Sequence, residues 1–124
     1  MTEKTSLHPA LTVRLYTDKK CFGPGVAMLL VRVQKLHSLR AAAKDMNMAY
    51  SKAWTILHTA EEELGLKLVR LTTGGRGGGG AELTSEGLTM LEAFSAYERE
   101  LKETADRLFP QYFQMFLPAG TEGG

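Results

Sequence analysis

The chain has 124 residues, 44% of them hydrophobic, which is enough for one modest core and too few for two ordinary domains. Its net charge is +1, it has one cysteine, and no stretch approaches the roughly 20 apolar residues that span a bilayer. These features exclude an intramolecular disulfide framework and a cysteine-cluster zinc site, and we expect a cytoplasmic protein without a signal peptide or membrane contact.

The first part of the chain contains one predicted strand and one predicted helix. Residues 1–11 are polar and we expect them to be flexible, whereas residues 12–17 are rich in β-branched and aromatic side chains and favour a short strand. Residues 19–25 are typical of a turn, with Pro24 well placed to open a helix. The apolar spacing predicts that helix over residues 25–36, with a buried face of Val26, Leu29, Leu30, Val33 and Leu36.

Two further helices are predicted on either side of a sharp turn. Ser38 is a suitable N-cap for a short helix over residues 39–46, whose alanine run lets another helix approach closely. Asn47 tolerates a left-handed turn, and a third helix is predicted over residues 50–64, closed by Gly65. This arrangement is typical of a helix-turn-helix, in which the second helix of the pair enters a major groove.

A hairpin is predicted after these helices. Residues 66–71 suit a half-exposed strand and residues 81–83 a returning strand, joined by the glycine-rich segment 72–80. Arg76 lies among the glycines, where the backbone can approach a sugar-phosphate surface and place a cation on a phosphate or in a minor groove. The same glycines match G-x-G-x-x-G, but no βαβ unit surrounds them, so a wing is favoured over a nucleotide site.

A last helix is predicted to begin after Thr84 or Ser85 and to be kinked or stopped at Pro110. Residues 111–117 beyond it are strongly apolar, and residues 119–124 are predicted to be disordered. Its apolar stripe is suited to dimerisation. The predicted dimer interface comprises Leu29 of the first helix together with Leu88, Leu91, Phe94, Tyr97, Leu101 and Leu108.

Charge is distributed unevenly along the chain. Residues 14–76 contain 11 lysines and arginines against 5 acidic residues, whereas residues 77–124 contain 3 against 8. The first region could face a polyanion and the second could not. On charge alone, a chance distribution of surface residues remains an equally good explanation.

The third predicted helix carries polar groups suited to reading DNA. Ser51 and Thr55 can donate or accept at base edges, and Lys52 can reach a guanine or a phosphate. Trp54 and Leu57 are predicted to be core residues, while Tyr50 either stacks inward or gives its hydroxyl to a phosphate. For each contact residue, an ordinary solvated surface is the alternative. The candidate DNA-binding residues are Ser38, Arg40, Tyr50, Ser51, Lys52, Thr55, His58, Thr73 and Arg76.

Several segments carry a resemblance to a known family. They are SLRAAAK at 38–44, YSKAW at 50–54, EELGLKLV at 62–69 and TGGRGGGGA at 73–81, followed by Leu83, Thr84 and Gly87. Over roughly residues 12–108 the chain resembles the N-terminal DNA-binding domain of the molybdate-responsive ModE regulators and, more distantly, the LysR-type regulators. The resemblance implies a winged-helix dimer, held by its first and last helices, that reads a palindromic operator.

The resemblance does not extend to ligand sensing. ModE regulators carry C-terminal domains that bind oxyanions, and only 14 residues follow Pro110 in this sequence. We therefore expect a chain without its own oxyanion-sensing domain. Either it regulates without a sensor, or a separate effector-sensing protein supplies one.

Together these features predict a mainly α fold with a small β-hairpin, a winged helix-turn-helix with a long C-terminal dimerisation helix. The expected organisation is a flexible segment at 1–11, the DNA-binding domain at 12–84, the dimerisation helix at 85–109 and a tail at 110–124. The predicted function is a DNA-binding transcription regulator. The alternative is a protein-interaction module that dimerises through its last helix.

We expect neither catalysis nor a cofactor or metal site. The three histidines show no metalloprotease spacing, no nucleophile elbow is present, and the acidic triplet at 61–63 is typical of a solvated helix end. An interaction module, by contrast, has no obvious use for Lys52 and Arg76 on one side of the molecule. This basic face favours the DNA-binding interpretation.

Overall fold

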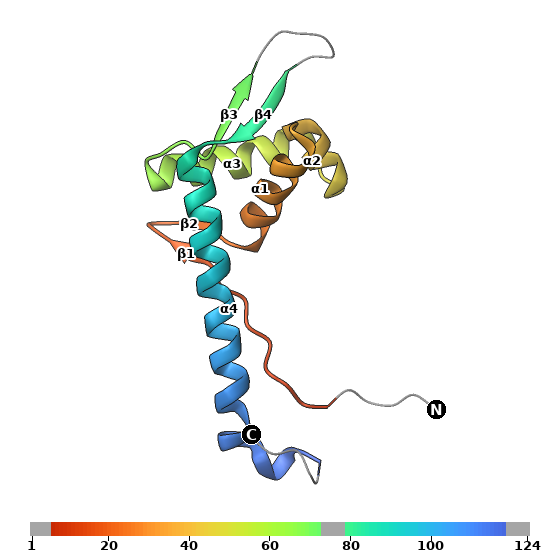
Figure 1. Cartoon of the computed structure of the whole chain (residues 1–124), viewed down its shortest axis with the longest axis vertical. Coiled ribbons are helices and arrows are strands. Elements are labelled where there is room, and N and C mark those ends of the chain that lie inside the picture. The colour runs from red at the N-terminus through yellow and green to blue at the C-terminus, as the bar shows by residue number, and fades with distance from the viewer. Residues whose placement is uncertain (1–5, 73–78, 119–124) are drawn as a thin grey trace, which may run out of the picture. The chain divides into compact units, whose positions relative to one another are not determined.

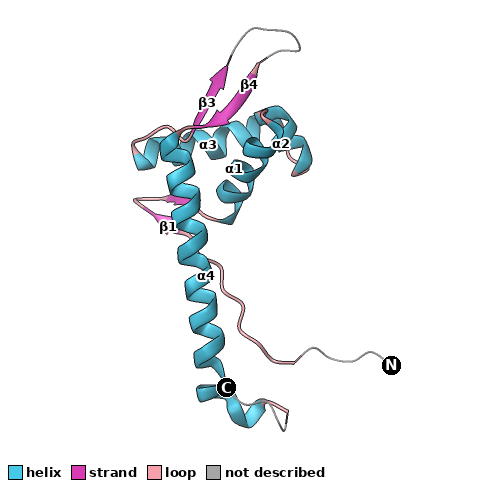
Figure 2. Ribbon diagram, viewed as in Figure 1, coloured by secondary structure: helices cyan, strands magenta, loops and turns pink. Residues whose placement is uncertain are grey.

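A computed structural model of the protein describes residues 6–72 and 79–118, which belong to two compact units. The first unit spans residues 12–95, and the second combines the N-terminal segment with residues from 96 onward. Helices predominate, accompanied by two antiparallel hairpins, and the predicted fold class is confirmed (Figure 2). The elements are β1 (Leu15–Tyr16), β2 (Lys20–Phe22), α1 (Pro24–Leu36), α2 (Leu39–Asp45), α3 (Tyr50–Leu64), β3 (Val69–Thr72), β4 (Gly80–Leu83), α4 (Ser85–Phe113) and the 3₁₀ helix Gln114–Phe116 (Figure 1).

The first hairpin corrects the prediction of a turn over residues 19–25. β2 pairs with β1, and Leu15 stands opposite Phe22. Cys21 and Phe22 are buried, and the Phe22 ring lies 5.0 Å from that of Phe94. Burial of Cys21 and Phe22 in the core holds the segment extended. The glycines and lysines around them gave no local indication of this.

Helix α1 begins at Pro24 and buries Val26, Leu29, Leu30 and Val33, as predicted. Leu36 is 44% exposed, so its predicted burial is wrong. It lies in the last turn, at the edge of the buried face, immediately before the left-handed residue that ends the helix.

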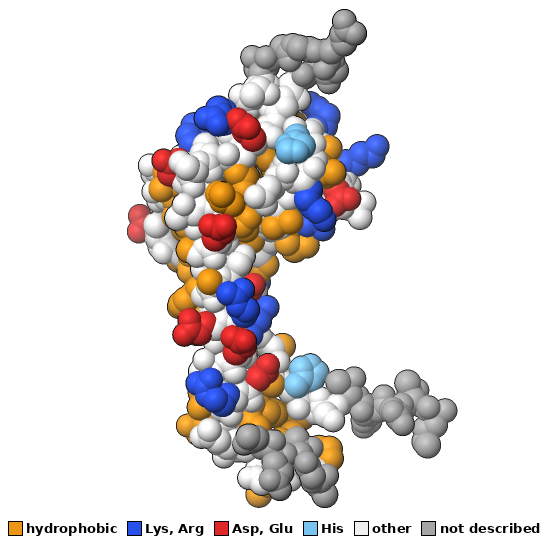
Figure 3. All heavy atoms as spheres, in the orientation of Figure 1, with side chains coloured by type: hydrophobic (Ala, Val, Ile, Leu, Met, Phe, Trp, Pro, Cys, Tyr) orange, Lys and Arg blue, Asp and Glu red, His pale blue; other side chains and the backbone are white. Residues whose placement is uncertain are grey.

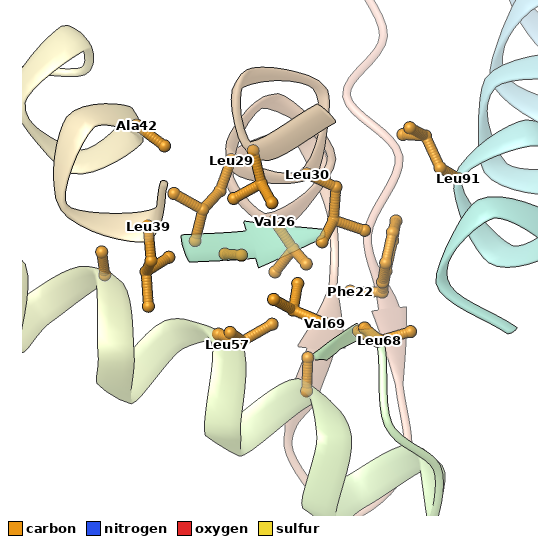
Figure 4. Close-up of a cluster of buried hydrophobic side chains, with 14 of the residues drawn as sticks. Phe22, Val26, Leu29, Leu30, Leu39, Ala42, Leu57, Leu68, Val69 and Leu91 are labelled. Carbon is orange, nitrogen blue, oxygen red and sulfur yellow. The ribbon is translucent and has the colours of Figure 1, made fainter. Parts of the chain in front are cut away.

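The helix-turn-helix forms as its capping residues predict. The Ser38 hydroxyl accepts a hydrogen bond from the Ala41 N–H at 3.0 Å, and Asn47 adopts a left-handed conformation with φ of 55°. Helix α3 ends at Gly65, which is also left-handed. Leu39 and Ala42 of α2 and Leu57 of α3 face Leu29 of α1 in one core (Figure 4). The close contact between α2 and its neighbours relies on fully buried alanines.

The second hairpin is joined to the helices through its base. β3 and β4 pair in register from Val69 opposite Leu83 to Thr72 opposite Gly80, and the Ala81 N–H donates to the His37 carbonyl at 2.9 Å. The segment 73–78 between the strands lies outside the described residues. The hairpin therefore starts from a fixed position beside α1.

Glu61 fixes the start of this hairpin from the inside. The residue is 7% exposed, and one carboxylate oxygen accepts from the backbone N–H groups of Leu68 and Val69 at 2.8 and 3.2 Å. The prediction of a solvated acidic triplet is thus wrong for this position. A buried carboxylate is stable here because it is hydrogen-bonded to two backbone donors that would otherwise lack partners.

Helix α4 starts against the hairpin and runs further than predicted. The Thr84 hydroxyl accepts from the Gly87 N–H at 2.9 Å, and a Cβ on Gly87 would lie 2.0 Å from the Leu68 carbonyl oxygen. Pro110 lies inside the helix, so of the two predicted outcomes, a kink or a stop, the stop is wrong. Only three helical residues follow it, and the stacked rings of Phe109 and Phe113, 4.9 Å apart, bridge this last turn.

In the second unit, residues 9–11 line a shallow pocket with Lys102 and Asp106 of α4. Among residues 6–72 and 79–118, no helix has the length and apolar character that a membrane crossing requires. The same residues contain no cluster of three side chains suited to holding a metal ion.

Candidate nucleic-acid interface

The two sides of α3 differ completely in their surroundings. Ala53, Leu57 and Ala60 have at most 1% of their surface exposed, and Glu61, which directly follows Ala60, is also buried. Ser51, Lys52 and Thr55 lie on the opposite side and are exposed. Helix α3 is therefore anchored by one side and presents a polar surface on the other, as predicted.

The polar groups of this surface are not used to hold the fold together. The Thr55 hydroxyl donates to the Ser51 carbonyl of its own helix at 2.9 Å, which leaves its oxygen able to accept. Lys52 makes no ion pair with any residue in the described ranges. These side chains remain available to a partner.

Arg40, Tyr50 and Ser38 lie near the start of the two helices. The Arg40 guanidinium lies 4.3 Å from the centre of the Tyr50 ring, a cation–π contact, and Tyr50 also packs on the core. The sequence left open whether the Tyr50 ring stacks inward, and the structure shows that it does. The Ser38 oxygen is occupied as the cap of α2.

Trp54 corrects the sequence prediction. Its side chain is 44% exposed rather than buried, and its indole stacks on the His58 ring with centroids 3.5 Å apart and planes at 17°. Leu57 is buried, as predicted. Trp54 directly follows the buried Ala53 and so lies at the edge of the buried side of α3, where its indole remains partly exposed.

A hollow of about 420 Å³ separates α3 from β3. His58 lines it from the helix, while Lys67 and Arg70 line it from the hairpin side. The Lys67 Nζ lies 3.7 Å from the Glu61 Oε1. The Arg70 guanidinium donates two hydrogen bonds to the Glu82 Oε1 on the opposite strand, at 2.8 and 3.0 Å. The sequence analysis did not single out these two cations, although both fall in the mixed apolar and basic segment 66–71.

The structure narrows the predicted dimer interface. Leu29, Leu91 and Phe94 have at most 6% of their surface exposed, because they fill the core of the same chain, and they are unavailable to a second copy. Leu88, Tyr97 and Leu108 are 38%, 52% and 40% exposed, and Leu101 is half-buried. Thr73 and Arg76, predicted to contact DNA, lie outside the described residues.

Helix α4 has a different charge character from α3. Acidic and basic side chains are interspersed along it, with Lys102 lying 3.6 Å from Glu98 (Figure 3). The first turn of α3 carries Lys52 and no acidic residue. An approaching polyanion would thus meet a more favourable surface on the first turns of α3 than on α4.

Comparison with known proteins places the helix-turn-helix and hairpin in one family. Residues 27–88 match the bacterial regulatory helix-turn-helix proteins of the lysR family. The chain is 34% identical over 80 residues to the molybdenum transport protein ModE of Azotobacter vinelandii, covering 64% of this chain and 30% of that protein. It is 33% identical over 85 residues to the DNA-binding transcriptional dual regulator ModE of Escherichia coli K12, covering 68% and 32% respectively.

A third relative bears a different name. The molybdenum-pterin-binding protein MopB of Rhodobacter capsulatus is 33% identical over 70 residues, covering 56% of this chain and 26% of that protein. The chain thus spans about a third or less of the length of these relatives. The family match over residues 27–88 contains α3 and the second hairpin.

Proposed function

The chain belongs to the lysR family of bacterial regulatory helix-turn-helix proteins, and on this premise we propose that it is a sequence-specific, DNA-binding transcription regulator. The observation that carries the proposal is the surface of α3. The helix is anchored by a buried side, while Ser51, Lys52 and Thr55 are exposed and make no contact that the fold requires. Such a helix can enter a major groove without rearrangement of the domain.

Base reading is assigned to the first turns of α3. Lys52 donates to guanine or to a phosphate, and the hydroxyls of Ser51 and Thr55 pair with base edges. A good contact of this kind is worth about 1–3 kcal/mol of discrimination against a wrong base. The N-terminal turns of a recognition helix are the part that meets the bases.

Phosphate binding is assigned to cations on either side of the base-reading residues. Arg40 lies near the start of α3, and Lys67 and Arg70 line the hollow between α3 and β3. A helix in the major groove places a backbone strand beside it, and these cations would neutralise its phosphates. Binding should therefore weaken steeply as salt concentration rises.

We assign dimerisation to exposed and half-buried apolar side chains of α4. Tyr97, Leu101 and Leu108 follow one another at spacings of four and seven residues, which puts them on one side of the helix. Two copies paired through this side would read two half-sites, and the operator would be palindromic. Replacing Tyr97 and Leu101 together by serine should shift sedimentation toward the monomer and weaken binding to the two-half-site duplex.

That prediction has a matched control. Tyr16 is 64% exposed and lies in β1, away from α4 in the sequence, so Tyr16→Ser removes an exposed tyrosine outside the proposed contact. A dimer that survives the double substitution would contradict the assignment and indicate α1 or the apolar residues after Pro110 instead.

The function itself is tested by selecting duplexes from a random library with the whole chain and measuring anisotropy across a salt series. A salt-steep preference for a palindromic site over a scrambled duplex is the expected result. Sequence-blind binding, or none, would contradict the proposal. It would favour the alternative of a protein-interaction module built on α4.

A further inference from the structure

The contact between Trp54 and His58 determines the orientation of the His58 ring and which of its nitrogens carries the hydrogen. The rings are stacked, and the His58 Nδ1 lies 2.9 Å from the Trp54 carbonyl oxygen. A carbonyl can only accept a hydrogen bond, so Nδ1 must be the donor. In a neutral imidazole the other nitrogen, Nε2, is then a pure acceptor.

This acceptor is not engaged by the fold. Among the described parts of the chain, His58 has no hydrogen bond other than the one to Trp54. The residue is half-buried and lines the hollow between α3 and β3, so its ring edge is open on one side. The stack on Trp54 and the Nδ1 bond together restrict the ring to one orientation.

His58 lies on the same side of α3 as the proposed base-reading residues Ser51 and Thr55, about one turn further along the helix. It follows Ser51 by seven residues and Thr55 by three, spacings that place all three on one face of a helix. The three side chains therefore form one row along the helix, from which each could reach a base edge. Along this row the Ser51 hydroxyl can donate or accept, whereas Thr55, whose hydrogen is bonded to the Ser51 carbonyl, and His58 offer acceptors.

We propose that His58 reads an exocyclic amino group in the major groove, the N6 amine of adenine or the N4 amine of cytosine, through Nε2. These amines are the only hydrogen-bond donors that base pairs present in that groove. Guanine and thymine present acceptors there, which would oppose Nε2 and cost affinity. The inference rests on the proposed function and adds the class of base recognised and the role of Trp54.

Trp54 is a positioning residue in this scheme. Its indole supports one face of the His58 ring, and its carbonyl fixes the tautomer. The carbonyl belongs to the backbone and survives any substitution at position 54. The ring stack does not, which allows the two contributions to be separated.

The first experiment compares the sites selected from a random duplex library by the whole wild-type chain and by His58→Lys. Lysine donates where Nε2 accepts, so the variant should replace adenine or cytosine by guanine at one position of each half-site and leave the other positions unchanged. His8→Lys is the matched control, because His8 is exposed and its Nδ1 is likewise paired with a backbone carbonyl, that of Ser6. Identical preferences for wild type and His58→Lys would overturn the proposal.

A second measurement removes the amine instead of the acceptor. In the selected duplex, adenine at that position is replaced by purine, or cytosine by 2-pyrimidinone, each of which lacks the exocyclic amine. Wild-type affinity should fall about five- to tenfold, the worth of one hydrogen bond with a buried partner left unpaired. His58→Ala should bind both duplexes equally, and an equal loss in wild type and variant would overturn the proposal.

The role of Trp54 has its own readout. Trp54→Leu should lose discrimination at the His58 position while keeping it at the positions read by Lys52, and Trp54→Phe should restore it because phenylalanine retains a ring face. Discrimination unchanged in Trp54→Leu would overturn the positioning role.

If the wild-type chain selects no site at all, the proposed function fails and this inference fails with it. A selected site that is insensitive to His58 contradicts the inference alone.

Discussion

The two sides of α3 are built on opposite principles although they belong to one helix. On the inner side, Leu57 is fully buried and Glu61 satisfies two backbone donors. On the outer side, Lys52 has no ion pair within the described ranges and Thr55 bonds only to its own helix. The comparison teaches that the position of the helix and its proposed reading of DNA are encoded by different residues. Substitutions on the inner side should change the free energy of unfolding, and substitutions on the outer side should change the affinity for DNA.

The largest effect is expected at the centre of the inner side. Leu57→Ala deletes a side chain that is 1% exposed, and it should lower the free energy of unfolding by about 3 kcal/mol because a cavity remains. Urea denaturation followed by circular dichroism measures the loss. Thr55→Ala, two residues away on the outer side, is the control and should stay within about 0.5 kcal/mol of wild type. Equal losses would contradict the separation of the two sides.

The contact that joins the hairpin to α4 is tested by Gly87→Ala. The new Cβ would lie 2.0 Å from the Leu68 carbonyl oxygen, so the backbone must shift, at a cost of about 2 kcal/mol in unfolding free energy. Gly25→Ala is the matched control, because nothing lies within 4 Å of a Cβ there and the residue is also helical. If both variants melt at the same temperature, the close approach of α4 to Leu68 is contradicted.

The outer side is tested by Lys52→Ala. Affinity for the selected duplex should fall about tenfold, equivalent to about 1.4 kcal/mol, and the salt dependence should become shallower if the amine meets a phosphate. Anisotropy measures both quantities, and urea denaturation should show unchanged stability. Lys102→Ala on α4 controls for loss of one positive charge. An equal fall in affinity for the two variants would mean that Lys52 contributes only net charge.

The smallest effect concerns the buried carboxylate. Glu61→Gln keeps an oxygen that can accept but removes its charge, and we expect a loss of about 1 kcal/mol in unfolding free energy. Glu62→Gln makes the same change at an exposed neighbour and should be silent. A Glu61→Gln protein as stable as its control would show that the charge adds nothing to the hydrogen bonds of Leu68 and Val69.

Local chemistry explains why much of the fold could be predicted. Ser38, Asn47 and Gly65 act through their own or adjacent backbone, so their capping and turning roles follow from residue type. The exposed face of α3 follows from helical periodicity for the same reason. The candidate residues Ser51, Lys52 and Thr55 were found in this way.

The errors have a common physical cause. Trp54 was assigned to the core for its size, but it lies at the edge of the buried side of α3 and stacks on His58 instead. Leu91 and Phe94 were assigned to a dimer, but residues distant in sequence, among them Phe22, bury them within the chain. An apolar stripe predicts that its side chains are buried, but it does not say whether the same chain or a second copy buries them.

The sequence by itself determined where the helices begin and turn and which side of α3 is polar, because these properties depend on neighbours within a few residues. The tertiary structure alone decided that β2 pairs with β1, that Glu61 is buried under β3, and that Trp54 stacks on His58 in the open. Those outcomes depend on volumes and hydrogen-bond partners contributed by other parts of the chain. They are determined only when the whole chain packs and its buried polar groups find hydrogen-bond partners.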